Sequence, residues 1–454
     1  MKTVTIIGSG LAGTLLALYM ARRGYEVSLF ESRPDMRRSE IDTGRSINLA
    51  LSCRGITGLA GVGLMPEVSQ IMVPMRARAI HLQDGEIKYQ SFGRTPEEHI
   101  NAILRNELNA ILLNRAEQEP GIRLHFDRKL EGVDVPHKRL HFICKDGKKY
   151  TTPYGILIGA DGAASIVRET LVKGKYIKAS RHFLNHGYKE LSISRQQGKQ
   201  FVAEHLHIWP RNAFMLLGNP NRDQSITGTL FLPKEGKNSF AELDNEESIR
   251  LFFKEKFSDA YLAMPDLMQE FRENPVGHMS TIHCSPWYYK DCLLIGDAAH
   301  GLVPFFGQGM NSAFEDCRIL NALLEEYKDN WEEAMPAFYQ ARKANTDAVA
   351  KMSMDNFYEI QTGISHEQFN LKKQIEQQLM HRYPARYVSK HVLVMFSNTP
   401  YATAYAIGEL QNELVDEIGK NTQSIESVNW PYVDKLMDSY DKKLANLDKK
   451  GKAH

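Results

Sequence analysis

Hydrophobic and polar residues at the start of the chain follow a strand–helix–strand pattern. Residues 2–7 form a short apolar run, and the sequence Gly8-Ser-Gly-Leu-Ala-Gly13 follows it. Apolar residues then recur at helical spacing up to Arg23, and residues 26–30 form a second apolar run. This order predicts one βαβ unit at the N-terminus and therefore a parallel sheet in a doubly wound α/β domain.

The middle of the chain has the short period that is typical of strands. Segments with strand character alternate with turn residues over about residues 73–92 and 176–271, which predicts a mostly antiparallel sheet. Between the two stretches, residues 100–119 have helical periodicity and residues 155–160 form an apolar strand. A further apolar strand lies at 291–295, and the chain from Trp331 onward has helical periodicity.

These patterns predict a chain of three parts. The first is a Rossmann-like α/β domain built from three separate segments, residues 1–72, 93–175 and 283–330. A mostly antiparallel β-sheet domain, residues 73–92 and 176–282, is inserted into it. Residues 331–454 are expected to form a helical C-terminal region.

Composition narrows the possible partners. The 454 residues contain 56 Lys and Arg against 55 Asp and Glu, a formal net charge of +1, so no overall charge favours nucleic acid or an anionic membrane. The five cysteines form no Cys-x-x-Cys pair, and no apolar run approaches the ~20 residues of a membrane-spanning helix. His205 and His207 lack a third ligand at metal-binding spacing, so we expect no metal site. We expect a cytoplasmic protein, a monomer or homodimer, that binds neither nucleic acid nor membrane.

The glycine motif near the N-terminus predicts a dinucleotide site. Gly8 suits a tight turn, Gly10 lets a pyrophosphate approach the backbone, and Gly13 allows the helix to pack closely on the strand. Glu31 follows the next strand, where its carboxylate can accept hydrogen bonds from both ribose hydroxyls of an adenosine. An unphosphorylated ribose favours FAD or NAD over NADP at this site. The alternative is a glycine-rich turn that binds nothing.

A second motif, residues 293–311, bears on which dinucleotide binds. An apolar strand places Asp297 at its carboxyl end, where α/β sheets bind ligands, and this carboxylate can hold a polyol hydroxyl. A glycine-containing loop follows, and the next helix begins near Gly309, Met310 and Asn311, whose N–H groups can face an anionic ring edge. Taken alone, an aspartate in this position is more often a helix cap or a structural acid.

Together these motifs resemble those of the flavin-dependent aromatic hydroxylases, the single-component monooxygenases that use NAD(P)H. The likeness is carried by the Gly8–Gly13 fingerprint with Glu31, by Asp161-Gly162 after a strand, and by Gly-Asp-Ala-Ala-His at 296–300. Four longer and more specific strings resemble one member of this family: residues 44–52, 75–81, 206–212 and 303–311. The resemblance covers roughly residues 1–360 and thins beyond them.

The resemblance implies an FAD-binding domain with bound FAD and a substrate-binding sheet domain. It also implies that Arg78 pairs with the carboxylate of an amino-acid substrate, with help from Asn356 and Tyr401. Where the family has a tyrosine that contacts the substrate, this chain has Phe92, and Tyr89 is the other candidate for that position. The cofactor contacts that the motifs and the resemblance predict are Gly8, Gly10, Ala12, Gly13, Glu31, Ala50, Arg105, Asn109, Asp297, Gly309, Met310 and Asn311.

The activity that the resemblance implies is hydroxylation of L-kynurenine to 3-hydroxy-L-kynurenine, a reaction of tryptophan catabolism, with NADPH and O2 and through a flavin C4a-hydroperoxide. Pro304, Phe305 and Phe306 are the expected catalytic wall beside the flavin, from which water must be excluded. NADPH is expected to bind transiently, because the sequence has no second Gly-x-Gly-x-x-Gly motif. The alternatives are a flavoenzyme for another aromatic acid and a non-catalytic flavin-binding sensor.

Overall fold

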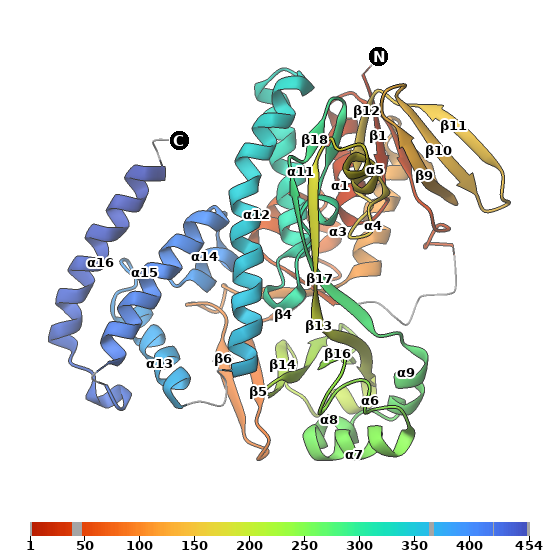
Figure 1. Cartoon of the computed structure of the whole chain (residues 1–454). Coiled ribbons are helices and arrows are strands. Elements are labelled where there is room, and N and C mark those ends of the chain that lie inside the picture. The colour runs from red at the N-terminus through yellow and green to blue at the C-terminus, as the bar shows by residue number, and fades with distance from the viewer. Residues whose placement is uncertain (1, 39–47, 363–366, 421, 452–454) are drawn as a thin grey trace.

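The computed structural model describes residues 2–38, 48–362, 367–420 and 422–451 of the chain. Figure 1 shows a part with sheets and helices that holds the N-terminus, a second β-sheet part below it, and a group of helices that leads to the C-terminus. Helix α12 (Trp331–Thr362) runs alongside both sheet-containing parts. This arrangement confirms the predicted α/β fold with an additional sheet and a helical C-terminal region.

The first sheet has six strands in the order β18-β19-β12-β1-β2-β8. β1 pairs in parallel with β12 and β2, the parallel pairing continues to β19 and β8, and β18 is antiparallel to β19. The predicted βαβ unit is therefore confirmed. The strands are β1 (Thr3–Ile7), β2 (Glu26–Phe30), β8 (Ile122–His125), β12 (Ile156–Gly159), β18 (Tyr288–Tyr289) and β19 (Cys292–Leu294).

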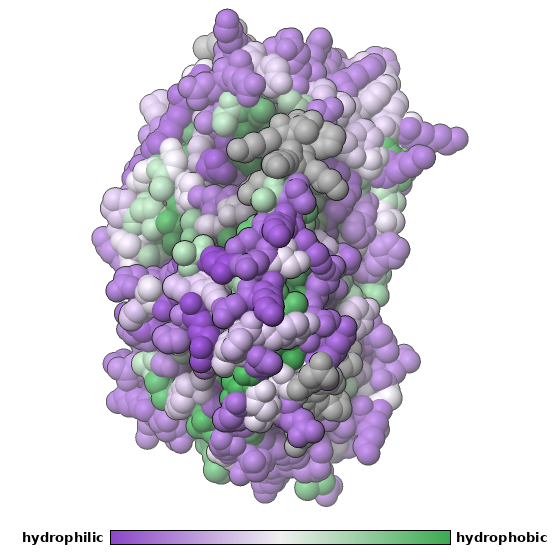
Figure 2. Space-filling view, turned by 90° about the vertical axis from the view of Figure 1, so that its left-hand side faces the viewer, coloured by the Kyte–Doolittle hydropathy of each residue, from purple (hydrophilic) through white to green (hydrophobic). Residues whose placement is uncertain are grey.

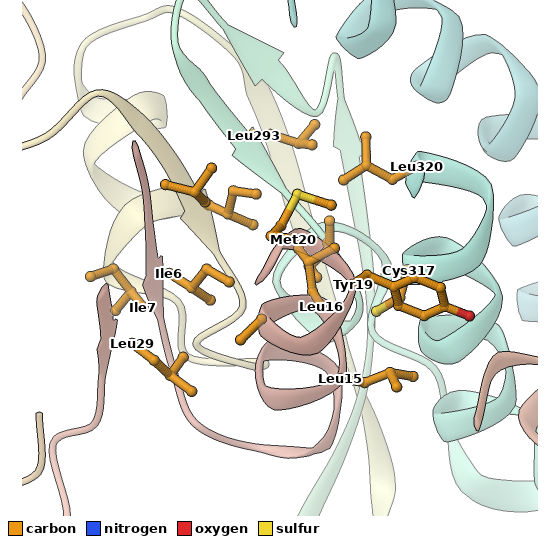
Figure 3. Packing of buried hydrophobic residues seen from close by; sticks show 14 of the residues in the cluster. Ile6, Ile7, Leu15, Leu16, Tyr19, Met20, Leu29, Leu293, Cys317 and Leu320 are labelled. Carbon is orange, nitrogen blue, oxygen red and sulfur yellow. The ribbon is translucent and has the colours of Figure 1, made fainter. Parts of the chain in front are cut away.

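Helix α1 (Leu11–Arg22) packs between this sheet and helix α11 (Gly309–Glu326), as Figure 3 shows. Leu16 and Met20 of α1 are fully buried, as is Leu320 of α11. Full burial of such a side chain contributes about 1.5–3 kcal/mol, so apolar contacts hold α1 against the sheet. The shorter helices of this part are α2 (Cys53–Ala60), α3 (Met65–Val68), α4 (Arg105–Gln118) and α5 (Ile166–Lys173).

Two further sheets have three strands each, and one of them corrects a prediction. β3 (Asn48–Leu51) and β4 (Val73–Met75) both pair with β7 (Ile100–Leu104). The expected helix over 100–119 is wrong at its start, because the first five residues join this sheet and α4 begins only at Arg105. β4 also lies in this sheet and not in the inserted one. The other sheet consists of β9 (Arg128–Asp134), β10 (Arg139–Cys144) and β11 (Lys149–Pro153).

The inserted sheet has seven strands in the order β17-β13-β16-β15-β14-β5-β6. Its pairings are antiparallel except that of β5 with β14. Leu216 and Leu230 pack against helices on one face, whereas Leu217 and Phe231 line a cavity on the other. The strands are β5 (Ala77–His81), β6 (Ile87–Ser91), β13 (Lys178–Ile193), β14 (His205–Arg211), β15 (Phe214–Pro220), β16 (Ile226–Pro233) and β17 (Gly277–Ser285). The helices are α6 (Arg195–Gly198), α7 (Glu246–Lys256), α8 (Ser258–Leu262) and α9 (Leu267–Glu273).

Helices α12 to α16 form the C-terminal region that the periodicity predicts. The buried Arg54 of α2 donates hydrogen bonds to the backbone carbonyls of Val394 and Thr399, which fastens this region to the first part. The face that these helices present is mainly hydrophilic (Figure 2), and none of the helices in the described ranges is long and apolar enough to cross a membrane. The helices after α12 are α13 (Glu367–Arg382), α14 (Lys390–Phe396), α15 (Tyr401–Gly419), η3 (Ile425–Ser427) and α16 (Trp430–Gly451).

Candidate active site

A cavity of about 2170 Å³ lies where the parts of the chain meet. The carboxyl ends of the parallel strands β1, β12 and β19 open into it, next to Gly10, Ala160 and Ile295. Phe231 of the seven-stranded sheet and His391 of the C-terminal helices also line it. Ligands of α/β proteins bind at the carboxyl edge of the sheet, so the cavity lies where the motifs predict a cofactor.

The glycine-rich loop between β1 and α1 has the geometry that its motif predicts. Gly8 has a φ of +103°, and a Cβ added there would lie 2.5 Å from the carbonyl oxygen of Ala160. A Cβ on Gly13 would lie 2.0 Å from the carbonyl oxygen of Gly8. Gly10 and Ala12 line the cavity, and no atom lies within 4 Å of a Cβ added to Gly10. Gly8 and Gly13 thus permit the tight turn, and Gly10 leaves space for a ligand beside the backbone.

Glu31 lies directly after β2 and is buried. Its Oε2 accepts from the Ser9 N–H at 3.1 Å, and its Oε1 accepts from Arg33 Nε at 2.9 Å. Burial alone would raise the pKa of Glu31, but Arg33 and the Ser9 N–H hold it below its ordinary value. The ionised carboxylate therefore fixes the glycine-rich loop. Glu31 is not among the described residues that line the cavity, so its ribose contact stays a prediction.

Asp297 begins helix α10 (Asp297–His300) just after β19 and lines the cavity. The turn before it is held by Asp316 of α11, which accepts from the Gly296 N–H at 3.0 Å and from His300 Nε2 at 2.6 Å. Burial would raise the pKa of Asp316, but His300 and Arg342 hold it below its ordinary value. His300 therefore acts in this buried network. The Asp297 side chain is exposed to the cavity. The cavity lies inside the protein, and this enclosure raises the pKa of Asp297 above its ordinary value.

Strand β3 and the start of α11 form another part of the wall, which includes Ala50, Gly309 and Met310. The Asn311 side chain donates to the carbonyl oxygens of Ala50 at 2.8 Å and Gly307 at 2.9 Å. It thus ties β3 to α11. Asn311 is not among the described residues that line the cavity, so the cofactor contact predicted there stays a prediction.

Arg105 and Asn109 lie one turn apart at the start of α4. Arg105 is exposed and lines the cavity. Asn109 is buried and its Nδ2 donates to Met36 Sδ at 3.1 Å, but its Oδ1 has no partner within the described part of the chain. A buried amide oxygen without a donor is costly. Asn109 is not among the described residues that line the cavity, so its cofactor contact stays a prediction.

These residues fit FAD. Neither α1 nor α11 has a side-chain cap or an acidic residue in its first turn. Their N-terminal N–H groups and positive dipole ends are therefore available to a pyrophosphate and to an anionic ring. Asp297 presents a carboxylate suited to a polyol hydroxyl, and Arg105 adds a positive charge to the same wall.

The predicted substrate residues Arg78 and Phe92 line the same cavity. The guanidinium carbon of Arg78 lies 4.5 Å from the centroid of the Phe92 ring, and Nη1 donates to Gln90 Oε1 at 3.3 Å. Tyr89 also lines the cavity but is mostly exposed and packs edge-on against His205. The aromatic contact with Arg78 is therefore made by Phe92.

His391 of α14 belongs to this site, although no sequence motif indicated it. Its Nε2 lies 3.5 Å from Nη2 of Arg78, and its ring stacks on Phe92 with centroids 5.9 Å apart. Burial, together with the charges of Arg78, Lys373 and Lys390, lowers the pKa of His391 well below its ordinary value. The neutral imidazole can therefore accept a hydrogen bond from the guanidinium.

The predicted catalytic wall, Pro304, Phe305 and Phe306, is the 3-10 helix η2 (Pro304–Phe306), and all three residues line the cavity. The Phe305 ring packs against Phe357 and Phe231, with centroids 4.6 and 5.2 Å away. Asn356 of α12 lines the cavity too, and its Nδ2 donates to the carbonyl oxygen of Phe305. Asn356 therefore holds the aromatic wall in place.

Tyr401 is not among the described residues that line the cavity. Its side chain is fully buried, its hydroxyl donates to Gln308 Oε1 at 2.8 Å, and the Arg54 guanidinium lies 3.9 Å from its ring centroid. The hydroxyl thus has a partner inside the protein in place of the expected substrate contact.

Tyr401→Phe is expected to leave the KM for the aromatic substrate unchanged and to lower the free energy of unfolding by about 1–2 kcal/mol, because Gln308 Oε1 loses its donor in a buried site. Urea unfolding and steady-state kinetics measure the two effects. A raised KM with unchanged stability would instead place the hydroxyl on the substrate.

Relatives of this chain are found along its whole length. Residues 1–355 match the family model described as FAD binding domain. A protein named kynurenine 3-monooxygenase from Legionella pneumophila (strain Corby) is 63% identical and covers 98% of this chain and 100% of its own length. A protein of the same name from Myxococcus xanthus (strain DK1622) is 43% identical and covers 94% of this chain and 93% of its own length.

Solved structures share the fold at low identity. The tetrameric form of 2-methyl-3-hydroxypyridine-5-carboxylic acid oxygenase is similar with a TM-score of 0.66 and 20% identity, and covers 81% of this chain and 94% of its own. PqsL from P. aeruginosa, in complex with 2-aminobenzoylacetate, is similar with a TM-score of 0.64 and 19% identity, and covers 80% and 97%. These likenesses show the fold alone. The family model and the full-length relatives show more: the chain belongs to the kynurenine 3-monooxygenase family of FAD-binding proteins.

Proposed function

We propose that the protein hydroxylates L-kynurenine to 3-hydroxy-L-kynurenine, with bound FAD and with NADPH and O2 as co-substrates. The observation that carries the proposal is Arg78, a cation in the cavity for which the described part of the chain supplies no ion-pair partner. L-Kynurenine is an α-amino acid with an aniline ring. It therefore offers a carboxylate to Arg78 and a flat, electron-rich ring to the aromatic wall.

The surroundings of Arg78 favour a carboxylate ligand. Enclosure in the protein lowers the pKa of Arg78 to about 10, although the charge of Glu359, which also lines the cavity, acts in the opposite direction. The guanidinium therefore stays charged at neutral pH, and its side-chain hydrogen bonds within the described residues go to Gln90 and His391 and not to a carboxylate. Its planar fork can bond both oxygens of a carboxylate. His391 accepts from Nη2 without adding charge, and Phe92 supports the guanidinium face.

The aromatic wall and the opposite sheet face orient the ring and exclude water from it. Phe305 and Phe306 lie on one side, and Leu217 and Phe231 contribute from the sheet. FAD, when bound along Gly10, Asp297 and α11, supplies electron transfer from NADPH and activation of O2. The N-terminal N–H groups of α11 would favour negative charge on a ring bound beside them, because they form the positive end of the helix dipole.

We extend the proposal to the binding of NADPH, the cellular compartment and the oligomeric state. NADPH binds only transiently, because the sequence has no second dinucleotide motif. The protein works in the cytoplasm, as a monomer or a homodimer, without a nucleic-acid or membrane partner. Near-neutral net charge and small ligands support this part of the proposal.

The purified holoprotein is expected to oxidise NADPH faster when L-kynurenine is added and to form one 3-hydroxy-L-kynurenine for each NADPH consumed. Absorbance of NADPH and chromatography of the product measure both quantities. Other aromatic acids, tested in parallel, are the control for a different substrate. Oxidation that yields only hydrogen peroxide would argue against L-kynurenine, and FAD-containing protein without any substrate-stimulated rate would favour a flavin-binding sensor.

A further inference from the structure

A relay of Asp259, His81 and His207 lies behind the strand that carries Arg78. Side chains of β5 alternate, so that Arg78 and Ile80 line the cavity while His81 lies on the opposite face, next to α8. His81 is 2% exposed and His207 is 1% exposed. Within the described part of the chain, no group of three or more potential ligands could hold a metal ion.

Three consecutive contacts connect these groups. His81 Nδ1 lies 2.8 Å from Asp259 Oδ2, and His81 Nε2 lies 2.9 Å from His207 Nδ1. His207 Nε2 lies 3.0 Å from the carbonyl oxygen of Val202. Trp209 stacks on His81 with centroids 4.1 Å apart and donates from Nε1 to the Asp259 carboxylate at 2.9 Å. The relay is therefore continuous from a carboxylate to a backbone carbonyl.

The contacts require three protons on the two rings. A carboxylate and a carbonyl at the two ends can only accept, so His81 Nδ1 and His207 Nε2 must both be N–H. The contact between the rings needs one more proton, whereas two neutral imidazoles carry only two in total. If both imidazoles were neutral, His81 Nε2 and His207 Nδ1 would face each other as two acceptors without a proton between them.

The third proton is best placed on His81. Burial lowers the pKa of His207 to about 4, so this ring stays neutral. Burial would raise the pKa of Asp259, but hydrogen bonds from His81 and Trp209 hold it below its ordinary value. The His81 imidazolium then lies against an ionised carboxylate, and the relay has no net charge. Arg211, which donates to the His81 carbonyl oxygen at 2.9 Å, is the other cation nearby.

The relay joins three elements that set the position of Arg78. His81 belongs to β5, His207 to β14 and Asp259 to α8. β5 reaches the rest of the sheet through its short parallel pairing with β14, from Ala77 to Ile80. We propose that the Asp259–His81–His207 relay, in its three-proton state, is a positioning device that holds Arg78 in place for the substrate carboxylate. This inference rests on the proposed function.

Asp259→Asn tests the relay, because it keeps the shape of the side chain and removes the charge that stabilises the third proton. The KM for L-kynurenine is expected to rise about tenfold, the effect of one charge-assisted hydrogen bond, while kcat and FAD content stay unchanged. Asp259→Glu retains the charge and is expected to restore most of the affinity. Asp266→Asn is the matched control, since Asp266 is exposed and its side chain does not cap α9.

Imidazole ¹⁵N NMR of the wild-type holoprotein counts the protons without any substrate. One imidazole protonated on both nitrogens and a second protonated only on Nε2 are expected at neutral pH, and the doubly protonated ring should disappear in Asp259→Asn. Two neutral rings in the wild type, or an unchanged KM in Asp259→Asn, would overturn the positioning role. A wild-type protein that does not turn over L-kynurenine would overturn the proposed function instead, and the proton count would still be readable.

Discussion

Replacing Arg78 with alanine is expected to raise the KM for L-kynurenine about 100-fold, because removal of one partner of an enclosed charge pair costs about 2–5 kcal/mol. FAD content should stay normal, since Arg78 lies in β5 of the inserted sheet, whereas the glycine-rich loop lies between β1 and α1. Steady-state kinetics and the ratio of flavin to protein measure the two effects.

Arg76→Ala is the matched control for this variant. Arg76 precedes β5 by one residue, is exposed, and pairs with Glu204 at 2.9 Å. It is not among the described residues that line the cavity, so its loss should leave the KM unchanged. Equal losses in both variants would indicate damage to the strand, and unchanged kinetics in Arg78→Ala would refute the carboxylate contact.

Gly10→Val is expected to give a folded protein that holds less than about a tenth of the normal FAD, because the pyrophosphate has to approach the backbone at this residue. The backbone of Gly10, with φ −71° and ψ −176°, suits valine, and no protein atom lies within 4 Å of the added Cβ. The new side chain therefore occupies the cavity and leaves the core intact. Flavin absorbance measures the cofactor, and far-ultraviolet circular dichroism measures the fold.

Gly132→Val in β9 is the control, because a Cβ on Gly132 also meets open space but lies outside the residues that line the cavity. This variant should purify yellow with a normal FAD content. If Gly10→Val were equally yellow, the pyrophosphate would have to bind elsewhere.

The residues expected to bind the cofactor could be predicted because they belong to short motifs of neighbouring residues. Gly8 and Gly10 lie in the turn between β1 and α1, and Gly13 lies in the first turn of α1. The backbone geometry of this short segment depends on these residues themselves. Asp297 likewise follows directly from the end of an apolar strand. Motifs of this kind place the side chains near one another whatever the rest of the chain does.

The part of the site expected to bind the substrate depends on contacts between segments that are distant in the sequence. The sequence alone therefore predicted fewer of its contacts. Residues 100–104 have an apolar pattern that suits a buried helix as well as a strand, and only pairing with β3 and β4 decides for the strand. His391 is one histidine on a short apolar helix until the fold brings it to Arg78. Tyr401 was predicted to help bind the substrate, and its buried hydrogen bond to Gln308 could not be foreseen because Gln308 comes from another part of the chain.

The separation between Arg78 and His391, which is 313 residues, has a consequence during protein synthesis. The βαβ unit with the glycine-rich loop needs only the first thirty or so residues and can form early, since local contacts close small loops. The pairing of β5 with β14 waits for the middle of the chain, and α14 leaves the ribosome later still. Long-range contacts also form slowly. A nascent chain thus shapes its nucleotide-binding turn long before it can recognise an amino acid.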